Sequence, residues 1–99
     1  MKINKIFDDK TLTIALEGEL NTATAPELEE VISSSLKPVE TLIFDFSKLD
    51  YLSSAGLRIL LIAQKIMSNQ GNMIIRHANK DIKDIFNITG FSNILTLED

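Results

Sequence analysis

The sequence contains no cysteine and only one histidine among its 99 residues. The lack of cysteine excludes a disulfide framework and a thiolate metal site, and it is consistent with a reducing compartment. No run of about 18 consecutive apolar residues occurs, which a membrane-spanning helix would require. The first residues also lack the apolar segment of a signal peptide. These absences predict a soluble, cytoplasmic protein that has no membrane partner.

Positive charge is scarce as well. The chain has 10 Lys and Arg residues against 14 Asp and Glu residues, which gives a net charge of −4. There is no basic cluster that could displace counterions from phosphates, so a nucleic-acid partner is not expected. Hydrophobic residues make up 44% and charged residues 24% of the chain, as in ordinary globular proteins. We therefore expect one folded domain over residues 1–99.

Residues that could carry out catalysis are few. His77 has no cysteine to join it, and general acid–base chemistry requires a second positioned group. The four glycines are scattered, so no glycine-rich phosphate loop is present. Asp45 lies at the C-terminal end of an expected central strand, where open α/β sheets place their sites, and it remains a candidate. The sequence predicts a protein that is not an enzyme and that has no cofactor or metal site.

The hydrophobic pattern predicts strands that alternate with helices. Strands are expected at residues 2–7, 11–17, 41–46 and 73–75, with a candidate edge strand at 94–97. Residues 8–10 suit a hairpin turn between the first two strands. Within residues 11–17, Leu12, Ile14 and Leu16 fall on one face, as in a half-buried strand. The nearly continuous apolar run at 41–46 is typical of a central strand covered on both faces.

Three helices are expected between these strands. Thr24 and Glu27 form a candidate capping box for the first helix, with Pro26 in its first turn and residues 37–38 ending it. The second helix is expected at about 54–69 and the third at 81–89, with Gly71 and Gly90 as their C-terminal caps. The order β-β-α-β-α-β-α predicts an α/β fold with a mixed sheet of four to five strands. This sheet is parallel in its middle and starts with an antiparallel hairpin.

The second helix has two distinct faces if it begins near residue 54. At 100° per residue, one face holds a serine, two basic residues and a leucine: Ser54, Arg58, Leu61 and Lys65. The opposite face, expected to pack on the sheet, holds Ile59, Ile62, Ala63, Ile66 and Met67. Leu61, and less clearly Leu57, are therefore predicted to lie on the outer side, where they could contact a partner.

Two segments carry a resemblance to a known family. Residues 17–28 read EGELNTATAPEL and residues 44–57 read FDFSKLDYLSSAGL. Together with the chain length and the element order, they resemble the STAS domain family, specifically the stand-alone anti-sigma-factor antagonists of bacterial partner-switching systems. The resemblance implies a STAS-type fold in which an anti-sigma factor with kinase activity binds the unphosphorylated domain. That kinase phosphorylates the serine two positions before the glycine, and a phosphatase reverses the modification to control transcription.

The serine at that position here is Ser54. A phosphate at a helix N-terminus is tolerated by the fold, because unpaired N–H groups and a partial positive charge face it. If the strands that precede the two segments run parallel, the two following loops meet at one edge of the sheet. The residues predicted to bind the partner are Asn21, Thr22, Ser53, Ala55, Gly56, Leu57, Arg58 and Leu61.

Two positions depart from the usual family pattern. Asn21 stands where the family usually has Asp, which removes a charge that could contact the kinase. Ser53 stands where many antagonists have Asp, so two neighbouring hydroxyls are present and Ser53 is the alternate phosphorylation site. On local chemistry alone, either serine could simply cap the second helix.

A different class of function is also open. Some STAS domains bind ligands, sense nucleotides or form the small soluble subunit of a lipid transport complex. Such subunits often lack the serine at the position of Ser54, and its presence favours the antagonist. An enzyme is the third hypothesis, which the missing catalytic constellations disfavour.

Overall fold

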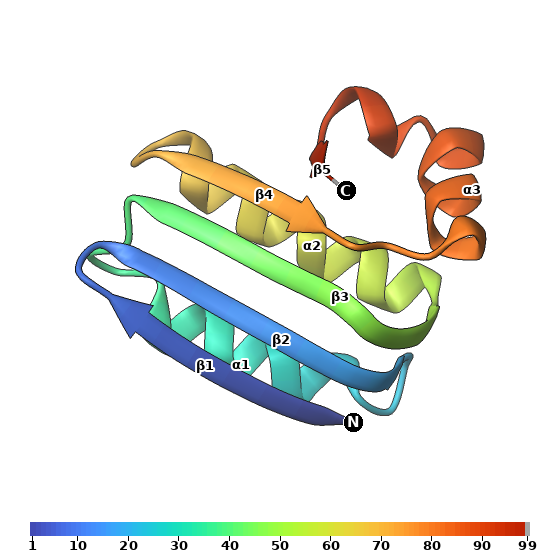
Figure 1. The fold of residues 1–99 in the computed structure, drawn as a ribbon, viewed down its shortest axis with the longest axis horizontal. Coiled ribbons are helices and arrows are strands. Elements are labelled where there is room, and N and C mark those ends of the chain that lie inside the picture. Colours follow the sequence, from blue (N-terminus) through green and yellow to red (C-terminus); the bar gives the residue numbers. More distant parts are fainter. Residues whose placement is uncertain (99) are drawn as a thin grey trace.

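A computed structural model describes residues 1–98 as a five-stranded sheet with three α-helices (Figure 1). The strands are β1 (Lys2–Asp8), β2 (Thr11–Leu20), β3 (Thr41–Leu52), β4 (Asn72–Arg76) and β5 (Thr96–Glu98). The helices are α1 (Ala25–Ser35), α2 (Ser54–Ser68) and α3 (Lys80–Thr89), and the short 3₁₀ helix η1 (Phe91–Asn93) follows α3. Residue 99, the last of the predicted domain, lies outside the described residues.

The topology confirms the predicted mixed sheet. Its strands are ordered β1-β2-β3-β4-β5, with β1 antiparallel to β2 and all other neighbours parallel. The expected hairpin turn lies between β1 and β2, where Asp9 has a positive φ of 57°. The edge strand β5 begins at Thr96, two residues later than expected. Among residues 1–98, no helix is both long enough and apolar enough to cross a membrane.

The core lies between the sheet and its covering helices. Leu12, Ile14 and Leu16 of β2 are fully buried, which confirms the face predicted from their alternation. In β3, Leu42 and Phe44 alternate in the same way. Figure 1 places α1 and α2 together behind the sheet, so these side chains pack under two neighbouring helices.

The prediction that residues 41–46 are covered on both faces is wrong. Within β3, Ile43 and Asp45 alternate with fully buried residues and are themselves only half-buried. In register, Ile43 stands between Thr13 of β2 and Ile74 of β4. These neighbours shield Ile43 laterally, so its apolar side chain requires no second layer of helices. β3 also runs six residues past the apolar run, to Leu52, and carries the chain to the start of α2.

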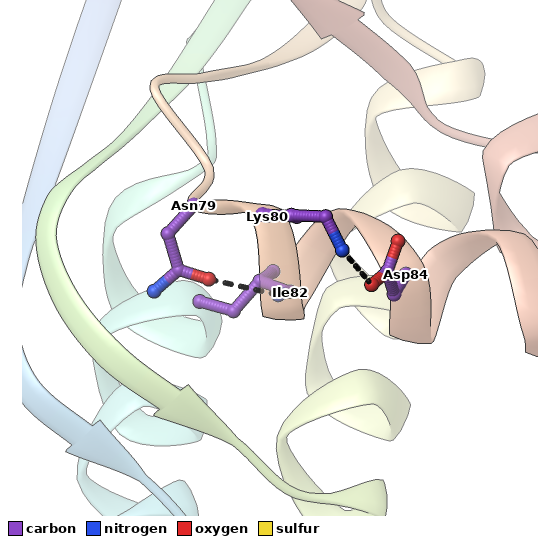
Figure 2. A network of polar contacts seen from close by, with 4 residues as sticks. All are labelled: Asn79, Lys80, Ile82 and Asp84. Carbon is purple, nitrogen blue, oxygen red and sulfur yellow. Dashed lines mark hydrogen bonds and ion pairs between the residues drawn. The ribbon is translucent and has the colours of Figure 1, made fainter.

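Asn79 fixes the position of α3 (Figure 2). Its side-chain oxygen accepts a hydrogen bond of 2.9 Å from the backbone N–H of Ile82, which caps the helix. Its side-chain nitrogen donates to the carbonyl of Leu49 in β3 at 3.2 Å. Lys80 and Asp84 form an ion pair one turn apart on the exposed side, at 3.2 Å. The cap therefore joins α3 to the extension of β3 that leads to α2.

The two glycines expected to cap helices have different roles. Gly90 is left-handed, with a φ of 81°, and ends α3 as predicted. The prediction for Gly71 is wrong, because α2 ends at Ser68 and its C-cap is Asn69, which has a right-handed backbone. A β-carbon on Gly71 would collide with the backbone carbonyl of Glu40. Glycine is required there because two segments far apart in the sequence pass very close to each other.

Replacing Gly71 with Ala is expected to lower the free energy of unfolding by about 1–3 kcal/mol, the usual cost of forcing extra atoms into a packed site. The control is Gly90→Asn, which adds a side chain in open space. Asparagine is one of the few residues that tolerate the left-handed backbone of this position. The control should change stability by about 1 kcal/mol or less. Urea unfolding of both variants measures this, and an unchanged Gly71→Ala protein would contradict the close approach.

Candidate phosphorylation and partner-binding site

The two predicted loops meet at one edge of the sheet. β2 and β3 run parallel, and their last residues, Leu20 and Leu52, are aligned in register. The backbone N–H of Ser53 donates to the carbonyl of Leu20 at 2.9 Å. In Figure 1 both strands end at the right-hand edge, where α1 and α2 begin. The structure therefore brings the start of α2 next to the loop over residues 21–24, as the sequence predicts.

The first turn of α2 packs closely on the ends of both strands. A β-carbon on Gly56 would lie 2.7 Å from side-chain carbons of Leu20 and Leu52, so a larger residue would have to displace these side chains. Ser53 is the N-cap, and its hydroxyl oxygen accepts a hydrogen bond of 3.3 Å from the backbone N–H of Gly56. The carbonyl of Ser53 accepts the first helical bond, from Leu57, at 3.0 Å. The first turn of α2 is thus held in place by packing against Leu20 and Leu52 and by the Ser53 cap.

Ser53 and Ser54 are not equivalent. The Ser53 hydroxyl is half-buried and serves as the cap, whereas Ser54 is the first residue of the helix and is exposed. Within residues 1–98, the side chain of Ser54 makes no hydrogen bond. Only the Ser54 hydroxyl is therefore free to react without the loss of a structural interaction.

Exchanging each serine for alanine separates these two roles. Ser53→Ala is expected to lower the free energy of unfolding by about 0.5–2 kcal/mol, because it removes the cap of α2. Ser54→Ala, the matched control, should stay within about 0.5 kcal/mol of the wild type, since no bond is lost. Thermal or chemical unfolding of the two variants provides the comparison. A larger loss for Ser54→Ala would mean that the cap has been assigned to the wrong serine.

The loop before α1 is held by its own side chains. The side-chain oxygen of Asn21 accepts hydrogen bonds from the backbone N–H groups of Ala23 and Thr24, at 3.0 and 3.1 Å. The Thr24 hydroxyl donates to the carbonyl of Glu19 at 2.8 Å and accepts from the N–H of Asn21 at 2.8 Å. The predicted capping box with Glu27 is therefore wrong, because the Thr24 side chain makes no cap bond to α1.

This arrangement explains how Asn21 can replace an aspartate. The oxygen that the loop requires as an acceptor is present in an amide as well as in a carboxylate. Asn21 is half-buried and its oxygen is occupied within the loop, while the neighbouring Thr22 is exposed. Of the two, Asn21 therefore shapes the loop and Thr22 offers the free surface.

The outer side of α2 carries part of the predicted surface. Arg58 and Lys65 are exposed, and Leu61 and Ala55 are half-buried. Gly56 and Leu57 are buried, with Leu57 only 7% exposed. The prediction that Leu57 lies on the outer side is therefore wrong, and neither residue offers side-chain surface to a partner.

The reason is a rotation of α2 relative to the expected orientation. Leu60, which the face analysis omitted, is fully buried, whereas Ile62 and Ile66 are only half-buried. The predicted burial of Ile59, Ala63 and Met67 is confirmed, and Gly56 and Leu60 extend the buried face at helical spacing from Ala63 and Met67. That spacing is present in the sequence and could have identified Leu60, but the isoleucines at positions 62 and 66 indicated a different face.

Comparison with known proteins identifies the family. Residues 2–99 match the STAS domain. This chain belongs to the STAS domain family. It is 33% identical over 96 residues to a Bordetella bronchiseptica protein that bears the name anti-sigma factor antagonist BtrV, a match that covers 95% of this chain and 83% of that protein.

Solved structures agree with this fold. An anti-sigma factor antagonist from Mycobacterium paratuberculosis has a TM-score of 0.88 at 22% identity, covering 97% of this STAS domain and 83% of that chain. The Bacillus protein SpoIIAA in its phosphorylated form has a TM-score of 0.78 at 20% identity, covering 99% and 92%. The STAS-type fold expected from the sequence is confirmed.

Two other polar candidates of the STAS domain do not join the site. Asp45 accepts a hydrogen bond of 3.0 Å from the backbone N–H of Ser47, next to an irregularity in the pairing of β2 with β3. Its carboxylate thus stabilises the bend of the strand. His77 follows β4 with a positive φ of 63° and is exposed. Within residues 1–98, no group of three or more His, Asp or Glu residues could hold a metal ion.

Tyr51 is a surface residue that the sequence analysis did not select. Its side chain is 49% exposed, and it pairs in register with Glu19, immediately before Leu20 and Leu52 close the strands. An exposed tyrosine beside the two loops is the type of residue that anchors protein interfaces. The strand expected from the sequence ended at residue 46, so no pattern placed Tyr51 beside Glu19 at the end of β3.

Proposed function

We propose that this STAS domain is an anti-sigma factor antagonist that acts by partner switching. In its unphosphorylated form it binds an anti-sigma factor, and phosphorylation of Ser54 releases that partner and so changes transcription. The observation that carries the proposal is the exposed, unbonded hydroxyl of Ser54 at the start of α2, next to the loop over residues 21–24. The names of the relatives, antagonists of anti-sigma factors, support the same role.

The position of Ser54 suits a reversible switch. A phosphate there adds about −1.5 to −2 charges. The N-terminus of a helix carries a partial positive charge, so the fold accepts the phosphate without rearrangement. The modified protein would thus remain folded but present a charged group where the partner docks.

The partners follow from this chemistry. The anti-sigma factor acts as the serine kinase that transfers the phosphoryl group from ATP, and a phosphatase regenerates the free hydroxyl. Transcription takes place in the cytoplasm, and the domain would act there. It works by binding, and the phosphoryl transfer is catalysed by its partner.

The test combines binding with mapping of the modified residue. The purified domain is mixed with each kinase-type anti-sigma factor of its source organism, with and without ATP, and phosphorylation is mapped by mass spectrometry. We expect binding without ATP and phosphate on Ser54. Phosphate on Ser53 would move the switch by one residue. No binding and no phosphate with any of them would contradict the proposal.

The ligand-binding alternative has one feature in its favour. A groove of about 250 Å³ lies between the C-terminal ends of α1 and α2, lined by Ile32, Ser33, Leu36, Lys37, Ile66 and Gln70. The volume is below the range of about 300–1,000 Å³ usual for ligand pockets. The amide nitrogen of Gln70 already donates to the carbonyls of Leu36 and Val39, both at 2.6 Å. The amide nitrogen in the groove wall is therefore already hydrogen-bonded within the chain. The antagonist remains the better supported function.

A further inference from the structure

The charges of α2 are all of one sign. Its only charged residues, Arg58 and Lys65, are basic and exposed, although the chain as a whole carries a net charge of −4. The other covering helix has the opposite character, since α1 exposes three carboxylates, Glu27, Glu29 and Glu30. The two helices that cover the sheet therefore expose charges of opposite sign.

Among residues 1–98, the two cations of α2 have no ion-pair partner. Ion pairs within residues 1–98 join, for example, Lys10 to Glu40, Arg76 to Glu98 and Lys80 to Asp84. Neither Arg58 nor Lys65 takes part in one, even though carboxylates outnumber cations in this protein. An unpaired arginine is available for a bidentate bond to a carboxylate from another molecule.

These cations lie on the same stripe of α2 as Ser54. Arg58 is one turn along the helix from Ser54, about 6 Å in rise, and Lys65 is about 10 Å further. The half-buried Leu61 lies between them. The stripe, defined by Ser54, Arg58, Leu61 and Lys65, thus combines the reactive serine, an apolar contact and two free cations on one surface.

We propose that this stripe is the docking surface for an acidic patch of the anti-sigma factor, whose carboxylates pair with Arg58 and Lys65 on either side of Leu61. The proposal rests on the proposed function and specifies the chemistry of its partner. Charge complementarity selects an acidic partner, and the continuity of the stripe with Ser54 selects the protein that acts on this serine. In an acidic molecule, a local basic surface also orients an acidic partner before contact.

The same arrangement describes how phosphorylation would act on docking. A phosphate on Ser54 lies within one turn of Arg58 and can pair with it in place of the partner's carboxylate. It also repels the acidic patch directly. Release would then combine the loss of one contact with a new repulsion, and both effects weaken as salt rises.

The test is a charge reversal with a matched control. Arg58→Glu/Lys65→Glu changes the net charge by the same amount as Lys2→Glu/Lys5→Glu, which alters exposed cations on β1, at the far edge of the sheet. Binding is measured by calorimetry, using as the probe the purified anti-sigma factor that binds the wild-type domain. At low salt, the α2 variant should bind about 30-fold more weakly, the control should change by about 3-fold at most, and the difference should shrink at high salt.

The other outcomes are distinguishable. Equal binding by the α2 variant and the control would overturn the acidic docking surface while leaving the antagonist function intact. Unchanged binding with slow phosphorylation would assign Arg58 to the transferred phosphate and would also overturn it. If no anti-sigma factor binds the wild type, the proposed function itself fails. Should the Glu variant not fold, Arg58→Gln/Lys65→Gln replaces it, with an expected loss of about 5-fold.

Discussion

The Ser54→Asp protein is expected to bind the anti-sigma factor about 100-fold more weakly than the wild type, or weaker still, whereas Ser54→Ala should bind normally and never be phosphorylated. Ser54 is exposed in the free domain but would be covered in the complex. In the complex Arg58 would be engaged by the partner, so a closely packed interface would bury this carboxylate without a counter-charge, at a cost of about 3–5 kcal/mol. Calorimetric titration of the three proteins with the same anti-sigma factor measures the difference.

A charge placed elsewhere provides the control. Ser34 is exposed on α1, and its replacement by Asp adds the same charge outside the α2 stripe. The Ser34→Asp protein should bind like the wild type. The stability of Ser54→Asp should change little, because the added charge meets the N-terminus of α2. Tight binding by a folded Ser54→Asp protein would refute the switch at this residue.

Replacing Leu60 with Ala is expected to destabilise the domain by about 2–5 kcal/mol, the usual cost of truncating a large core side chain. Leu60 is fully buried on the inner side of α2, whereas its neighbour Leu61 is half-buried on the outer side. Leu61→Ala should therefore cost about 1 kcal/mol or less. For a domain whose total stability is about 5–15 kcal/mol, the first change removes a large part and the second does not.

This pair of variants separates stability from binding. Leu61→Ala should fold normally but weaken binding to the anti-sigma factor, since Leu61 lies between the two cations of the stripe. Ile62→Ala, at a half-buried position, should fall between Leu60→Ala and Leu61→Ala in stability. Urea denaturation of the three proteins gives the order. Equal losses at Leu60 and Leu61 would mean that α2 is oriented differently on the sheet.

Local patterns were sufficient to predict the order of the elements. The alternation of Leu12, Ile14 and Leu16 identified β2 and its buried face, because neighbouring side chains of a strand point to opposite sides. The start of α2 was predicted from serines that precede a helical spacing of apolar residues. The meeting of the two loops also followed from the order alone, since parallel strands end at the same edge.

The roles of individual residues at the site required the tertiary structure. The sequence left open which of Ser53 and Ser54 is free, because both can cap a helix, and only the bond from Gly56 to Ser53 distinguishes them. It also assigned Leu57 to the outer side. The rotation of α2 is decided by how Gly56 fits between the ends of β2 and β3, a contact with residues far away in the chain.

Sequence by itself thus determined the family and the succession of strands and helices, since each rests on residues close together in the chain. Tertiary structure alone decided the close approach of Gly71 to Glu40, the single covered face of β3 and the two unpaired cations of α2. The physical reason is that packing, lateral shielding and ion pairing join segments whose separation in the sequence carries no periodic signal.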